Sequence, residues 1–100
     1  MFAMLKGKQK RFLRALGTGI DPILQIGKAG ITDNTVKQLD DALEARELVK
    51  VRVLPNSGQE VKEVAEALKD KVNAELVQVI GNNFLLYRKS KEKPKIELPL

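Results

Sequence analysis

Apolar and polar residues follow two different periods along this chain, and each period predicts one kind of element. Three segments repeat apolar residues every three or four positions, which predicts helices at residues 5–17, 33–46 and 61–72. Four shorter segments are continuously apolar or alternate strictly, which predicts strands at residues 22–26, 48–54, 76–80 and 84–88. Helices and strands are therefore expected to alternate until a final pair of consecutive strands.

Residues that cap helices or turn the chain stand between these segments. Gly17 is placed to end the first helix, and Thr32 is placed to cap the N-terminus of the second. Ser57 and Glu60 have the spacing of a capping box ahead of the third helix. Gly81 and the two asparagines after it predict a hairpin between the last two strands, since both residue types tolerate positive φ.

The element order predicts a two-layer α/β domain, α-β-α-β-α-β-β, around a four-stranded mixed sheet. Lys50 and Arg52 alternate with three valines, so their face of the sheet, which Gln25 and Gln78 are expected to share, should be partly open. The other face should be covered by the second and third helices. One core is expected to bury the periodic residues Val49, Val51, Val53, Val61, Val64, Leu68, Val72, Leu39, Leu43, Val77 and Val79.

One domain is expected over residues 1–90, followed by a loosely ordered basic tail at residues 91–100. Ile96 and Leu98 are the tail's candidates for docking on the domain. Phe12 shares a helix side with Leu5 and Leu16 and is therefore assigned to the core. No exposed apolar helix face is evident in the pattern, so a monomer is expected.

The composition excludes several kinds of functional site but says less about the fold. The 100 residues are 43% apolar and 31% charged, which suits a folded domain with a wet surface. Without Cys or His, disulfides, thiolate sites and the commonest general base and metal ligand are excluded. No apolar run approaches a membrane span, and the N-terminus is too basic for a signal peptide. A cytoplasmic protein that is not an enzyme is expected, with no cofactor, metal or small-molecule substrate.

The net charge of +5 is concentrated at the two ends of the chain. Residues 1–30 carry six bases and one acid, residues 31–75 carry seven bases and ten acids, and residues 76–100 carry five bases and two acids. Such asymmetry favours a polyanionic partner. Within the first helix, a basic row is formed by Lys6, Lys10 and Arg14, which Lys8 and Arg11 extend. The acidic cluster of Asp40, Asp41 and Glu44 is interpreted as a solvated helix face rather than a metal site.

A short loop between the first strand and the second helix is the candidate anion site. It consists of Gly27, Lys28, Ala29 and Gly30. A helix start presents unsatisfied N–H groups, and glycines let the backbone approach a phosphate. The loop lacks the GK[ST] ending of a nucleotide-binding P-loop. A GxxG alone is common, but together with the basic first helix it favours binding to a nucleic-acid backbone.

Four blocks of sequence, in order, resemble the YhbY-type CRM domain, named for chloroplast RNA splicing and ribosome maturation. The blocks span residues 7–16, 25–32, 47–51 and 76–81 with 86–88, so the resemblance covers about residues 4–90, nearly the whole chain. The resemblance implies a fold similar to the C-terminal domain of the third bacterial translation initiation factor. It also implies an RNA-binding protein of the stand-alone bacterial type, associated with precursors of the large ribosomal subunit. The implied RNA contacts are Gly27, Lys28, Gly30 and the cations of the first block.

Two functions remain open at this stage. The first is binding of structured ribosomal RNA through the GxxG loop and the basic helix, by backbone and shape rather than by base sequence. The second is a protein-interaction module whose acidic middle binds a basic ribosomal protein. Lys50 and Arg52 either contact RNA or solvate the sheet, and Tyr87 either stacks on RNA or packs in the fold. RNA cross-linking would separate the two functions.

Overall fold

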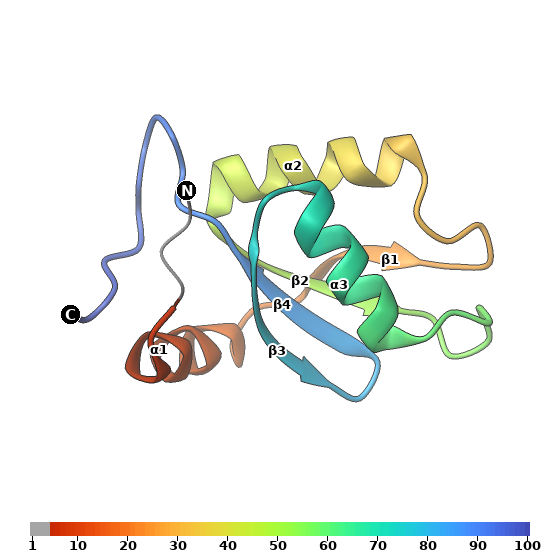
Figure 1. The fold of residues 1–100 in the computed structure, drawn as a ribbon, viewed down its shortest axis with the longest axis horizontal. Coiled ribbons are helices and arrows are strands. Elements are labelled where there is room, and N and C mark those ends of the chain that lie inside the picture. Colours follow the sequence, from red (N-terminus) through yellow and green to blue (C-terminus); the bar gives the residue numbers. More distant parts are fainter. Residues whose placement is uncertain (1–4) are drawn as a thin grey trace.

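The computed structural model describes residues 5–100, and it contains the seven elements in the predicted order. Residues 1–4 of the predicted domain lie outside the described residues. The helices are α1 (Gly7–Gly17), α2 (Asp33–Arg46) and α3 (Val61–Lys71). The strands are β1 (Pro22–Ile26), β2 (Leu48–Val53), β3 (Glu75–Ile80) and β4 (Asn83–Tyr87). The predicted α/β arrangement is confirmed (Figure 1).

The four strands form one mixed sheet in the order β1-β2-β4-β3. β1 runs parallel to β2, whereas β4 is antiparallel to both β2 and β3. Val51 therefore sits at the centre, beside Leu24 of β1 and Phe84 of β4. The predicted hairpin joins β3 to β4, and Gly81 adopts a positive φ of 56° there, but Asn83, which was expected in the turn, already belongs to β4.

Helices pack on both faces of this sheet. α2 and α3 cover one face and bury the main core, which includes the β2 valines with Leu39, Leu43, Leu68 and Phe84. α1 packs on the opposite face and buries a second core of Leu13, Leu48, Val77, Leu85 and Tyr87. α1 thus adds a partial third layer to the two layers predicted (Figure 1). Gly17 allows the close approach, because a Cβ there would overlap the Leu85 side chain.

The prediction of a single core is wrong at three of the valines. Val77 belongs to the second core, Val61 is only half-buried, and Val79 is exposed. The outcome at Val77 and Val79 follows from a register shift between Leu76 and Gln78, which breaks the strict alternation of β3. β3 is also an edge strand, so its side chains have a neighbouring strand on one side only.

The assignment of Phe12 to the core is also wrong, since 38% of the surface of this residue is exposed. α1 turns its Leu13 and Gly17 side to the sheet, and a helix rotates about 100° per residue, so Phe12 points away from the contact. Leu16 is exposed as well. α1 therefore presents apolar side chains to solvent, contrary to the expectation behind the monomer prediction.

The predicted helix caps have different outcomes. Thr32 caps α2 as predicted, because its hydroxyl accepts a hydrogen bond from the Thr35 N–H at 3.2 Å. The capping box at Ser57 is wrong, because α3 starts one turn later, with Glu60 in the N-cap position and no side-chain cap. Ser57 instead accepts a hydrogen bond from the Gln59 N–H and stabilises the preceding loop.

Residues 88–100 form no helix or strand, but hydrogen bonds attach them at several points. The buried Glu47 carboxylate accepts from the N–H groups of Ser90, Lys95 and Ile96, at 2.8, 2.6 and 2.7 Å. Glu44 accepts from the Ser90 hydroxyl at 2.6 Å. Ile96 and Leu98 pack against the second core, as the sequence suggested. The tail thereby links the end of α2 to α1.

Candidate nucleic-acid interface

The cations of α1 lie beside and opposite its buried side, and none of them belongs to the second core. Because Leu13 faces the sheet, the cations of the row are distributed around the remaining surface of the helix. Lys6, Lys8, Arg11 and Arg14 are exposed, and Lys10 is half-buried. Arg14 borders the part of the sheet that α1 leaves uncovered.

This uncovered part, the open half of the sheet, presents Lys50 and Arg52 from β2. Their neighbours Val49, Val51 and Val53 point into the main core, so the alternation predicted from sequence is confirmed. Arg52 is exposed and pairs in register with Gln25 of β1 and Asn83 of β4. Lys50 is half-buried. The open half of the sheet therefore carries two cations among neutral polar groups.

The GxxG loop connects β1 to α2 at the end of the sheet away from α1. Lys28 and Ala29 are exposed, and Gly30 has a φ of +68°, where a side chain would be strained. The Gly30 N–H donates to the Gly27 carbonyl at 3.0 Å, so this N–H cannot also bind a phosphate. The N–H groups of Lys28 and Ala29 have no acceptor within residues 5–100.

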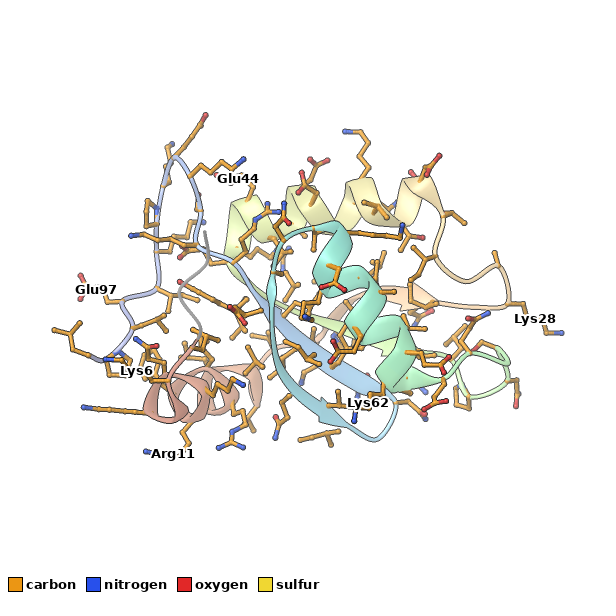
Figure 2. All side chains as sticks on the ribbon, viewed as in Figure 1. Lys6, Arg11, Lys28, Glu44, Lys62 and Glu97 are labelled. Carbon is orange, nitrogen blue, oxygen red and sulfur yellow. The ribbon has the colours of Figure 1, made fainter. Side chains whose placement is uncertain are left out.

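The structure separates the two predicted basic regions. Figure 2 places Lys28 at one end of the long axis, and Lys6 and Arg11 at the other. The molecule extends 39 Å along this axis. Lys50 and Arg52 of the open half lie between the ends, because β2 runs from the α1 end toward the residues that precede the loop. The sheet therefore lies between α1 and the GxxG loop.

Ion pairs are confined to the other side of the domain. Among residues 5–100 they are Lys37–Asp41, Lys69–Glu66, Lys69–Asp70 and Arg88–Asp40, all on α2, on α3 or just after β4. No ion pair within this range involves Lys6, Lys10, Arg11, Arg14, Lys28, Lys50 or Arg52. Lys8 donates to the Leu100 oxygen at 3.2 Å. Apart from Lys8, the cations on the α1 face and the loop are thus available to an external anion.

Comparison with known proteins assigns the family. Residues 5–88 match the model of the CRS1 / YhbY (CRM) domain. The chain belongs to this family. The CRM domain is 54% identical over 96 residues to the "Probable RNA-binding protein YqeI" of Bacillus subtilis, covering 96% of this chain and all of that protein. It is 35% identical to an "RNA-binding protein" of Haemophilus influenzae, with 95% of each chain covered.

A solved structure shows the same fold. The solution structure of the hypothetical protein SAV1595 from Staphylococcus aureus superposes with a TM-score of 0.80 at 58% identity, covering 96% of this CRM domain and all of that chain. Within residues 5–100, none of the helices combines the length and apolar character that crossing a membrane requires. RNA binding is thus the property by which the relatives are named, and the surface described above is where this CRM domain offers cations.

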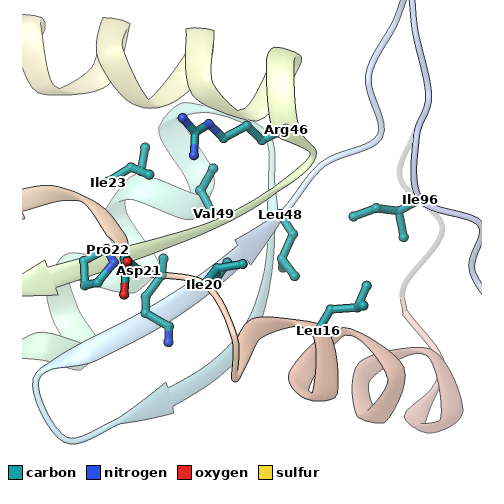
Figure 3. Close-up of a pocket in the computed structure, with 10 residues that line it drawn as sticks. Leu16, Ile20, Asp21, Pro22, Ile23, Arg46, Leu48, Val49 and Ile96 are labelled. Carbon is teal, nitrogen blue, oxygen red and sulfur yellow. The ribbon is translucent and has the colours of Figure 1, made fainter.

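An apolar cleft of about 530 Å³ lies beside Lys50, between α1, the start of β1 and the tail (Figure 3). Its walls are largely aliphatic, with Leu16, Ile20 and Ile96 among them. Arg46, from the last turn of α2, was not among the predicted site residues, yet it borders this cleft. Its position in the helix gave no signal, because only the packing of α1 and the tail creates the cleft.

Tyr87 does not provide a stacking surface in this CRM domain. Its side chain is buried in the second core. Burial raises the pKa of the Tyr87 hydroxyl, and the negative charge of Glu47 raises that pKa further. The strand assignment was right, but sequence could not show that α1 and the tail cover this part of the sheet.

The acidic residues of α2 are partly used within the domain. Arg88 donates to Asp40 Oδ1 at 2.6 Å, and Glu44 accepts from the Ser90 hydroxyl and from the N–H groups of Lys91 and Glu92. The Ser90 hydroxyl is the main cause that lowers the pKa of Glu44. Within residues 5–100 no group of three or more acidic side chains is arranged to hold a metal ion.

Proposed function

We propose that this CRM domain binds structured ribosomal RNA, in the cytoplasm, within a precursor of the large ribosomal subunit. The contacts are made to RNA phosphates by the cations of α1, by Lys50 and Arg52, and by the GxxG loop with Lys28. The observation that supports this most directly is the location of the ion pairs. Acidic partners neutralise Lys37 of α2 and Lys69 of α3, whereas no cation of the α1 face or the loop has an acidic partner within residues 5–100.

Phosphate binding explains why these cations are spread along the molecule. An RNA backbone carries regularly spaced charges, so a row of separate cations can contact several phosphates, each releasing a counterion. From Arg14 through Lys50 and Arg52 to Lys28, the cations follow the open half of the sheet. Backbone contacts of this kind position the protein without reading bases.

The alternative, a protein-interaction module with an acidic docking face, has less support. Asp40 already pairs with Arg88, and Glu44 and Glu47 already bind the tail. A basic ribosomal protein would have to compete with these internal contacts. RNA cross-linking and the salt dependence of binding remain the measurements that separate the two functions.

Replacing Arg14, Lys50 and Arg52 together with alanine is expected to weaken binding to a structured large-subunit RNA fragment. Three lost phosphate contacts should reduce the slope of log Kd against log salt by about two to three units. Fluorescence anisotropy between low and physiological salt measures both effects. The matched control replaces Lys37, Lys62 and Lys71 with alanine, which removes the same charge from exposed positions of α2 and α3.

The control variant is expected to bind like wild type. Equal losses in the two triple variants would mean that net charge, not this surface, governs binding. A wild-type affinity that does not change with salt would contradict phosphate binding and favour the protein-interaction alternative.

Lys28→Ala and Gly30→Val test the loop separately. Lys28→Ala should weaken RNA binding a few-fold, lower the salt slope by about one unit and leave Tm nearly unchanged, since Lys28 is exposed. Gly30→Val should reduce binding more, because valine is strained at φ +68° and its Cβ would lie 3.3 Å from Gln59 Nε2.

The control for backbone strain is Gly58→Val. Gly58 also has positive φ, at +79°, but its Cβ position is open space in a neighbouring loop. Both glycine variants should lower Tm, and only Gly30→Val should lower the affinity for RNA. If Lys28→Ala and Gly30→Val both bind RNA like wild type, the loop is not part of the interface.

A further inference from the structure

A small hollow lies between the end of α1 and the open half of the sheet. Its volume is about 210 Å³. Gly17 lines the hollow at the point where α1 approaches Leu85 of β4 too closely for a side chain. α1 and the residue after it contribute Arg14 and Thr18, and the three strands contribute Lys50, Gln78 and Asn83. It is thus enclosed by four separate segments of the chain, in the middle of the proposed phosphate-binding surface.

Neutral polar groups in this hollow are not used by the fold. Asn83 Oδ1 is screened from solvent and accepts no hydrogen bond. The side-chain amide of Gln78 makes no hydrogen bond within residues 5–100, although it stands opposite Leu85 in the sheet. Buried polar groups are nearly always hydrogen-bonded, so an orphaned amide oxygen indicates a missing partner. Rotation about the broad χ2 of Asn83 can turn the amide toward a bound group.

The remaining walls supply apolar surface and positive charge. Leu85 of the second core lines the hollow, whereas the Phe84 side chain belongs to the main core on the other face of the sheet. Ile80, with 58% of its surface exposed, stands at the edge of the hollow. Arg14 and Lys50 border it and form no ion pair within residues 5–100. Apolar walls suit the faces of a planar ring, amides suit its polar edge, and cations at the border suit a phosphate. This is the combination that one unpaired nucleotide requires.

We propose that this hollow receives one unpaired base of the bound RNA, whose polar edge is read by the amides of Asn83 and Gln78. The proposal rests on the proposed function and extends it, because backbone contacts alone give no base preference. A side-chain amide pairs a donor with an acceptor and so distinguishes bases by the order of their own donors and acceptors. Lys50 and Arg14 hold the phosphates on either side of that nucleotide.

The test uses octanucleotides of uridine in which one central position is A, C, G or U. Fluorescence anisotropy gives Kd for each RNA with wild type, Asn83→Ala, Gln78→Ala and the control Asn82→Ala. Asn82 is the exposed turn residue next to Asn83 and does not line the hollow. Tm of each variant shows that the fold is retained.

Wild type should bind the RNA with the preferred central base about tenfold more tightly than the RNA with the least favoured one. This is the discrimination that a good hydrogen-bonded amide–base contact provides. Asn83→Ala should reduce this preference to within twofold, Gln78→Ala should reduce it in part, and Asn82→Ala should keep it. The salt slope should not change in any of them, because no charge is removed.

Two results would overturn the base pocket while leaving the proposed function intact. One is wild-type binding that depends on salt but shows no base preference. The other is a preference that survives in both Asn83→Ala and Gln78→Ala. Failure of wild type to bind both these octanucleotides and the structured large-subunit RNA fragment would instead contradict the proposed function, and the base pocket with it.

Discussion

Replacing Glu47 with alanine is expected to release the tail and lower the free energy of unfolding by about 2–4 kcal/mol, given three charge-assisted hydrogen bonds. The carboxylate is buried at the end of α2 and accepts from Ser90, Lys95 and Ile96. Without it, these N–H groups must stay unsatisfied or the tail must leave. Urea denaturation measures the loss, and amide hydrogen exchange at Ser90 and Ile96 shows the release.

The backbone conformation of Glu47 suggests glycine as a second substitution at this position. Glu47 has a φ of +67°, a conformation that glycine adopts without strain. Alanine keeps the strain of glutamate, so Glu47→Ala reports the loss of the carboxylate alone. Glu47→Gly relieves the strain and should therefore be more stable than Glu47→Ala. Glu44→Ala, at a half-buried carboxylate, should cost less than either.

The pH dependence follows from the same contacts. Burial raises the pKa of Glu47, but the three N–H donors outweigh burial and hold the pKa below its ordinary value of 4.5. A carboxyl with a lowered folded pKa stabilises the protein fully above its ordinary pKa and loses this contribution as the pH falls through the folded value. The stability gap between wild type and Glu47→Ala should thus shrink below pH 4.5. A gap that stays constant down to pH 2 would contradict this account of the carboxylate.

Leu68→Ala is expected to destabilise the domain by about 2–5 kcal/mol, the range for a leucine removed from a packed core. Leu68 has no exposed surface and lies on the buried side of α3, against the sheet. The lost side chain leaves a cavity that the rigid sheet can fill only in part. Thermal and urea denaturation both measure the effect.

Leu100→Ala is the matched control, because the same atoms are removed from a residue with 98% of its surface exposed. It should change the free energy of unfolding by less than about 0.5 kcal/mol. A loss below about 1 kcal/mol for Leu68→Ala would mean that α3 repacks and that the main core is less rigid than its burial indicates.

The sequence predicted the elements because their periods are local. The alternation of β2 depends on one segment, and so does the spacing of Val64 and Leu68 in α3 and of Val72 at its C-cap; both predictions are confirmed. The exceptions, Val79 and Phe12, depend on tertiary contacts. The register shift in β3 decides which of its side chains are buried, and the rotation of α1 against the sheet does the same for α1.

The candidate site was predictable in its residue types but not in its arrangement. Spacing placed Lys50 and Arg52 on a partly open face of the sheet and identified the GxxG loop as a separate feature. Spacing could not show that α1 and Lys28 lie at opposite ends of the molecule, because the separation of two segments in sequence says little about which end of a sheet a helix covers. Asn83 reads in the sequence as a turn residue, and only the docking of α1 gives its side chain a second role.

The strand order has a consequence for the kinetics of folding. The central strands β2 and β4 are not consecutive, so residues 54–82 form a loop that must close before Val51 meets Phe84. Closing such a loop costs entropy before stabilising contacts form, so we expect the rate-limiting barrier of folding at this long-range pairing. β1 and β3 each attach along one edge only. Exchange of the central amides therefore reports global unfolding, whereas the edge strands open in smaller local fluctuations.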